Sequence, residues 1–233
     1  MKLATCPIVL LFLTLFAPLE AAAECKDPTD PKISVEIEET PARVDRSLPL
    51  IELSKIPSAS RRAGMEAYDR TLGLTEAEIG ARADIDLLTV EDGGGGYCTT
   101  ARSAMIVLEW STVVRIAAQI PVGSCIDKVV SEHEQKHVAI DRALIPIARQ
   151  AIELALTSVV RHGAHGKTLA ESQHNLEEQA RVAINVAVDV FSVVRTRRQL
   201  ALDSKDEYDK VPSSCGLFQY LKIMRGDLPK AGT

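Results

Sequence analysis

The feature that most constrains the fold is the stretch after Gly123, which has the signals of one long amphipathic helix. Ser124 and Asp127 form an S-x-x-D capping pattern, which predicts that the helix begins at Cys125. Its apolar residues recur at helical spacing and form one stripe, made of Ile126, Val129, Val130, Ile140 and Leu144. His133 and His137 fall in the same stripe. We therefore expect both histidines to face the interior.

A second long helix is predicted further along the chain. Pro146 should bend or break the first helix, after which "IARQAIELALTSVV" continues the helical pattern up to a glycine. Thr168 and Glu171 then form a capping box, which predicts a helix from Thr168 to about Leu200.

The first half of the chain has mostly strand patterns. Residues 32–38 alternate as K-I-S-V-E-I-E, and the runs 104–109 and 112–120 are rich in β-branched residues, which predicts a hairpin or two strands. The glycines at 93–96 predict a turn. Strands followed by two long helices predict an α+β fold, with a small sheet or hairpin region packed on the two C-terminal helices.

One segment of this half has helical signals instead. "TEAEIGARADI" begins with Thr75, and Glu78 completes a capping box with it. We interpret the segment as a short helix.

The N-terminus predicts export. Lys2 precedes a short apolar run, and an A-x-A site follows, so we interpret residues 1–23 as a signal peptide. The remainder divides into an N-terminal strand and extended segment, 24–57, and one domain, 58–233. Because the apolar run is too short to span a bilayer, we expect a secreted or periplasmic protein with no membrane association after signal removal.

Four cysteines remain after residues 1–23 are removed, which predicts two disulfides in an oxidising compartment. Three pairings are open. We favour Cys98 with Cys125, which flank the predicted hairpin, and Cys25 with Cys215, which would tie the two ends together. The alternative, a cysteine zinc cluster, is disfavoured because the sequence has no C-x-x-C pair.

The chemistry of the first long helix comes from His133-Glu134-Gln135-Lys136-His137, an H-E-x-x-H motif. Helical residues four apart have Cβ atoms about 5 to 6 Å apart, so both imidazoles can reach one Zn²⁺ at about 2.0 to 2.1 Å. Glu134 then lies beside the metal as the catalytic general base. The motif predicts one Zn²⁺ per chain. The alternative is a pair of core histidines, or a solvated charged stretch.

A catalytic zinc takes three protein ligands and keeps the fourth position for water. The candidates for the third ligand are Glu171, His174, Glu178, Asp203 and Glu207. Asp141 lies about 12 Å along the helix from His133, so we expect it to orient a ligand histidine or to pair with an arginine. His162 and His165, which lie beside glycines, are expected to be loop residues.

The chain resembles the predicted secreted zinc-dependent proteases of the zincin group. The resemblance covers about residues 98–215 and rests on "PVGSC", "EHEQKHVAIDRALI" and the tail "RRQLALDSKDEYDKV". It implies a zincin-like fold, with His133 and His137 as ligands, Glu134 as general base, and the preceding strand, 112–120, holding an extended peptide. The G-x-x-H that follows the motif in metzincins is absent.

These observations predict an exported zinc metallopeptidase acting on a peptide or protein, with Tyr208 as an oxyanion donor. One alternative is a non-catalytic exported module that binds a metal or a peptide. Another is a di-iron helical protein, since Glu134–His137 and Glu171–His174 are both E-x-x-H. The net charge of −5 and the lack of a basic block argue against nucleic acid as a partner. The oligomeric state is left open.

Overall fold

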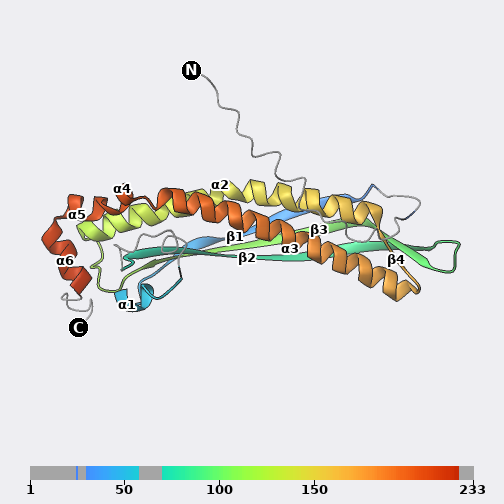
Figure 1. Cartoon of the computed structure of the whole chain (residues 1–233), viewed down its shortest axis with the longest axis horizontal. Coiled ribbons are helices and arrows are strands. Elements are labelled where there is room, and N and C mark those ends of the chain that lie inside the picture. Colours follow the sequence, from blue (N-terminus) through green and yellow to red (C-terminus); the bar gives the residue numbers. More distant parts are fainter. Residues whose placement is uncertain (1–24, 26–29, 58–69, 226–233) are drawn as a thin grey trace, which may run out of the picture.

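The computed structural model describes residue 25 and residues 30–57 and 70–225; the predicted signal peptide lies outside them. The molecule is elongated, with two long helices running beside a narrow sheet (Figure 1). In chain order the elements are β1 (Lys32–Asp45), α1 (Leu50–Leu53), β2 (Gly73–Glu91), β3 (Tyr97–Ile116), α2 (Cys125–His162), β4 (Ala164–Gly166), α3 (Leu169–Leu202), α4 (Lys205–Tyr208), α5 (Lys210–Cys215) and α6 (Leu217–Arg225). The predicted α+β class is confirmed, with a small mixed sheet.

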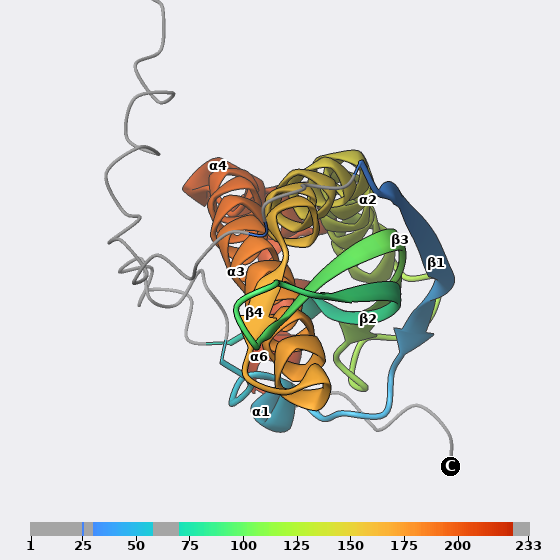
Figure 2. The ribbon, with the colours of Figure 1, turned by 90° about the vertical axis from the view of Figure 1, so that its right-hand side faces the viewer.

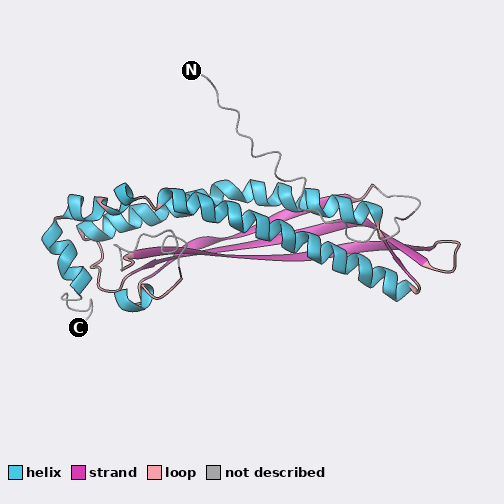
Figure 3. Ribbon diagram, in the orientation of Figure 1, coloured by secondary structure: helices cyan, strands magenta, loops and turns pink. Residues whose placement is uncertain are grey.

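The sheet has the strand order β1-β3-β2, with β3 in the centre. β1 pairs parallel with β3, so the strand of the predicted N-terminal segment belongs to the same sheet as the rest. β2 and β3 form an antiparallel hairpin, whose turn contains the predicted glycine turn at 93–96. β4 extends the sheet by pairing with Tyr97–Thr99 at the start of β3. Figure 3 shows the three long strands lying beside the helices.

The helices cover one face of the sheet, as the end-on view in Figure 2 shows. The buried face of β3 contributes Ala104, Ile106, Leu108, Trp110, Val114 and Ile116. Trp110 meets Phe191 of α3 edge-on, with 5.5 Å between the ring centroids. On the opposite face, Arg82 of β2 pairs with Glu109 of the adjacent strand β3 and with Glu38 of β1 beyond it. A sheet with one buried side typically packs an apolar face against the helices and turns a charged face toward solvent.

Two strand-region predictions are wrong. β3 is one continuous strand rather than a hairpin at Trp110–Ser111. The segment from Thr75 is part of β2 rather than a short helix. Ala and Glu favour helices intrinsically, but Ala77, Ile79 and Ile85 alternate along the strand and pack against the core. Tertiary packing of this alternating set outweighs the local helical preference.

Both long helices begin at the predicted caps. Ser124 Oγ accepts a hydrogen bond from Asp127 N at 3.1 Å, and Thr168 Oγ1 accepts one from Glu171 N at 3.2 Å. Pro146 lies inside α2, which continues past it, so the helix is not broken there. Within the described residues α2 is the one helix long and apolar enough to cross a membrane by length and composition. The same features suit a helix that covers a core, where α2 buries its apolar stripe.

The disulfides join Cys25 to Cys98 and Cys125 to Cys215, so the favoured pairing was wrong. The physical reason is the length of β3. A strand of 20 residues spans about 65 Å, and it places Cys98 and Cys125 near opposite ends of the molecule. Each disulfide therefore closes one end.

Candidate metal centre

The centre is formed where two polar stripes face each other across the antiparallel pair of α2 and α3. Each stripe repeats every fourth residue, which keeps its members on one helix face. The α2 stripe is His133, His137 and Asp141; the α3 stripe and its C-cap are Arg195, Gln199 and Asp203. The first residue of one stripe meets the last of the other, because the helices run in opposite directions.

Three ligand atoms converge at the outer end of these stripes. Asp203 Oδ1 lies 3.2 Å from His133 Nε2 and 3.0 Å from His137 Nε2. The two Nε2 atoms are themselves 3.0 Å apart. Of the proposed third ligands, the structure therefore brings Asp203 to the two histidines. Two imidazole nitrogens and one carboxylate oxygen are a donor set that fits catalytic zinc.

Three of the other candidates lie far from the centre. Glu171, His174 and Glu178 are in the first turns of α3, about 38 to 48 Å along that helix from Asp203. The two E-x-x-H pairs are correspondingly at different ends of the helix pair. A di-iron bundle needs both pairs at one site, and the two pairs in this structure are too far apart for that.

His137 is held from behind by a buried network. Gln199 Nε2 donates to the carbonyl oxygen of His137 at 3.2 Å and to Asp141 Oδ1, while its Oε1 accepts from His137 Nδ1. Arg195 clamps Asp141 with two hydrogen bonds of 2.8 Å. Asp141 therefore pairs with an arginine, one of its two expected arrangements. Sequence reasoning missed Gln199 and Arg195, although their four-residue spacing before Asp203 was visible.

His133 has a carboxylate behind it. Its Nδ1 is buried and makes no hydrogen bond within the described part of the chain, but Glu207 Oε2 lies 3.5 Å away. Lys136 and Lys210 donate to Glu207, and these hydrogen bonds lower the pKa of Glu207 to about 2. Glu207 therefore stays charged and faces the Nδ1 side of the ring, which leaves Nε2 toward the centre.

The charge state of the centre follows from burial and close partners. Burial tends to raise the pKa of Asp203, but its contacts with His133 and His137 outweigh this and hold the pKa well below its usual range. Burial tends to lower the pKa of His137, but Asp203 and Glu134 outweigh it, so that pKa is raised. The site thus favours an ionised carboxylate together with a positive charge.

Glu134 faces β2 and is buried. Thr75 Oγ1 donates to Glu134 Oε2 at 2.7 Å, and burial raises the pKa of this carboxyl. Gly73 makes the close approach of strand and helix possible, since a Cβ there would lie 2.5 Å from Glu134 Oε1. Neither Thr75 nor Gly73 was recognised from sequence, because the strand was misread as a helix.

The centre opens into a pocket of about 340 Å³. It is lined by the start of β2, by His133, His137 and Asp203, and by apolar side chains such as Val130 and Val211. Tyr208 also lines the pocket, and the centroid of its ring lies 5.9 Å from the centroid of the His133 ring. The wall mixes apolar side chains with many polar and charged ones from both long helices. A pocket of this size suits a small ligand or a side chain of a larger one.

The strand expected to hold a peptide is not available. Residues 112–116 belong to β3, which is paired with β1 on one side and β2 on the other, so the prediction for 112–120 is wrong. Within the described part of the chain, the strand edge beside the centre is the outer edge of β2, near Gly73–Ala77.

Comparison with protein-family models, curated proteins and solved structures finds no match to this chain. A function can therefore be proposed only from the geometry of the centre itself.

Proposed function

We propose that the chain is an exported zinc-dependent metallopeptidase with a zincin-like arrangement of its active-site helix. The observation that carries the proposal is the convergence of His133 Nε2, His137 Nε2 and Asp203 Oδ1 within 3.2 Å of one another. All three are atoms that can donate a lone pair to a metal ion.

The tautomer of His137 strengthens the case. The amide nitrogen of Gln199 already donates to two acceptors, so its oxygen must face His137 Nδ1, which therefore carries a proton. A histidine ring that binds a metal is neutral, and Nε2 is then an unprotonated acceptor on the side of Asp203. A metal cation would attract all three ligand atoms at once. Metal-ligating histidines commonly donate the N–H of their second ring nitrogen to an oxygen atom in the same way.

The residues then have distinct roles. When bound, zinc supplies Lewis-acid activation of water and of the scissile carbonyl. Glu134, held by Thr75, accepts the proton of the attacking water and passes it to the leaving amine. Tyr208, on the pocket wall, donates to the developing oxyanion. An extended peptide adds to the outer edge of β2 at Gly73–Ala77, which places its carbonyl groups beside the centre.

The test has two parts, both on the mature protein purified without chelators. Metal analysis of wild type should give one zinc per chain, and His133→Ala should give none. Glu134→Gln should keep its zinc and lose hydrolysis of unfolded protein substrates by about 10²- to 10⁴-fold. The matched control is Glu177→Gln, a charge-neutralising change at an exposed position of α3. It should leave the zinc content and the rate of hydrolysis unchanged.

Two outcomes would overturn the proposal. A folded, zinc-supplemented wild type that holds no metal removes the centre. Turnover retained in Glu134→Gln removes the assigned general base. Zinc that binds firmly without turnover on any peptide would instead favour the non-catalytic binding module.

A further inference from the structure

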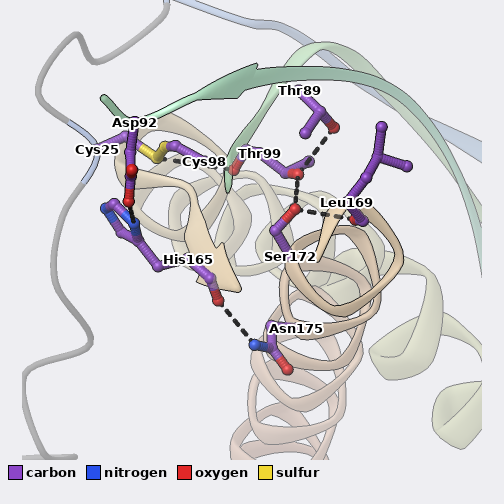
Figure 4. The surroundings of a disulfide bond; sticks show 9 residues. All are labelled: Cys25, Thr89, Asp92, Cys98, Thr99, His165, Leu169, Ser172 and Asn175. Carbon is purple, nitrogen blue, oxygen red and sulfur yellow. Dashed lines mark hydrogen bonds and ion pairs between the residues drawn. A yellow bond between two sulfur atoms is a disulfide. The ribbon is translucent and has the colours of Figure 1, made fainter. Parts of the chain in front are cut away.

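A second group of ligand-type side chains lies at the other end of the helix pair, around the Cys25–Cys98 disulfide (Figure 4). His165 of β4 is the cross-strand partner of Cys98 in β3. A ring nitrogen of His165 and the two sulfur atoms lie within 4.8 Å of one another. Both cysteines are buried, and His165 is partly exposed. His165 was expected to be a loop residue, but the strand pairing fixes its position.

The three side chains are held in place by contacts other than the sulfur–sulfur bond. Cys98 and His165 are fixed by the pairing of β3 with β4. Cys25 N donates to the carbonyl oxygen of His162 at 3.1 Å. Gly163 lets Cys25 approach closely, since a Cβ at this glycine would lie 2.7 Å from Cys25 Sγ. These contacts join the three segments independently of the disulfide.

A chain of buried and half-buried hydroxyl groups supports the same region. Thr99 Oγ1 lies 2.8 Å from both Thr89 Oγ1 and Ser172 Oγ, and Ser172 in turn donates to the carbonyl oxygen of Leu169 at 2.9 Å. Asn175 of α3 donates to the carbonyl oxygen of His165 at 2.8 Å. These bonds join the hairpin to the start of α3, and none of them involves sulfur.

His165 also has a carboxylate beside its ring. Asp92 Oδ2 lies 3.5 Å from His165 Nδ1, and Asp92 is fixed by hydrogen bonds from the backbone nitrogens of Gly94 and Gly96 at 2.7 and 3.0 Å. A carboxylate behind one ring nitrogen is the usual partner of a metal-ligating histidine.

We propose that reduction of the Cys25–Cys98 disulfide turns this group into a second metal site, in which two thiolates and the imidazole of His165 bind zinc or another thiophilic divalent ion. A dithiol reductant supplies two electrons and two protons, becomes a disulfide itself and leaves two thiols. Each thiol then loses its proton as it binds the ion. Two sulfurs and one nitrogen are a donor set typical of zinc.

The site would give this end of the molecule two alternative cross-links. The disulfide joins Cys25, which precedes β1 in the chain, to β3, and the ion would join these two segments and β4. A chain that reaches an oxidising compartment with its thiols reduced would bind the ion first. A disulfide oxidant of that compartment would later accept two electrons from the two thiolates and become a dithiol, which releases the ion and leaves the Cys25–Cys98 disulfide.

The test uses cobalt(II), because thiolate-to-cobalt charge transfer gives an absorption band that a centre of two histidines and a carboxylate does not produce. The mature chain carries His133→Ala, which removes the first centre. A phosphine reductant takes oxygen from one water molecule, becomes the phosphine oxide and leaves the two thiols. The reduced chain should show the thiolate band with one cobalt, and the oxidised chain should not.

Four variants make the result specific. His165→Ala should weaken cobalt binding at least tenfold, and Asp92→Asn should weaken it by about 10- to 100-fold. His162→Ala, at the exposed end of α2, is the matched control and should bind like its parent. Cys215→Ser removes a thiol at the opposite end and should keep the band.

A reduced chain without a thiolate band overturns the proposal, whether or not circular dichroism shows that its helices persist. Equal affinities in His165→Ala and His162→Ala overturn the role of His165. Neither result depends on zinc or turnover at the first centre.

Discussion

The two ends of the α2–α3 pair are built from similar parts but are set up for different chemistry. His137 and the last residue of α2, His162, are 25 positions and so about 38 Å apart on one helix. Each end has a disulfide and histidines near a carboxylate. At the first end the ligand atoms face a pocket, whereas at the second the two sulfurs are bonded to each other. Under the two proposals, the availability of ligand atoms, rather than the residue types, is what distinguishes a catalytic centre at one end from a structural link at the other.

The largest expected effect comes from removing a histidine at each end of α2. His137→Ala should lose the zinc of the mature, oxidised protein and all peptide hydrolysis, because it removes one of three ligands. His162→Ala should retain both, since its ring is exposed and bonds within its own helix to the carbonyl oxygen of Ser158. Metal analysis and a protease assay on the two variants check this. Equal zinc contents would contradict the contrast between the ends.

The next effect separates the two disulfides. They close loops with sequence separations of 90 and 73 residues, so replacing either pair by serine should lower the free energy of unfolding by a similar amount, about 4 kcal/mol. Only loss of Cys125–Cys215 should also weaken zinc binding. That bond anchors α5, whose Val211 lines the pocket. Denaturant unfolding and zinc titration of both double variants test this, and equal zinc affinities would contradict it.

A smaller effect is expected from the network behind His137. Gln199→Leu keeps the size of the side chain but removes the acceptor of the Nδ1 proton, so zinc affinity should fall about 10- to 100-fold. Gln150→Leu, at an exposed position of α2, is the matched control. Competition with a zinc chelator measures both. Unchanged affinity in Gln199→Leu would show that Gln199 does not orient the ligand.

Much of the first centre follows from local signals in the sequence. The cap at Ser124, the apolar stripe and the four-residue spacing of the histidines place both rings on one inward face. From the sequence, Asp203 was one of several candidates for the third zinc ligand. Its position depends on the length of α3 and on the antiparallel register of the two helices, which local patterns do not specify. The spacing of Arg195, Gln199 and Asp203 is the signal that would have favoured it.

The far end was less predictable because its contacts are long-range. The pairing of Cys25 with Cys98 requires that β3 be one strand, and that β1 return beside it in parallel. The segment from Thr75, at the first end, was misread for a different reason: helix-forming residues in β2 hid the alternation that packs it on the core. A strand in that place puts Gly73 against Glu134.

The smallest effect sharpens the account of the first end without removing any ligand or base. Gly73→Ala adds a Cβ that would meet Glu134 Oε1 at 2.5 Å and Val130 Cγ1 at 2.7 Å, so the carboxylate must shift. We expect peptide hydrolysis to fall roughly tenfold, because displacing a catalytic group by a fraction of an ångström is costly, while zinc content stays at one per chain. Gly80→Ala in the same strand is the matched control, since its nearest neighbour would be Glu109 Oε2 at 3.5 Å, an ordinary contact. Steady-state kinetics and metal analysis distinguish the outcomes. Equal activity in the two variants would mean that Glu134 can move without loss, and its role as a positioned base would then fail while the zinc ligands stand.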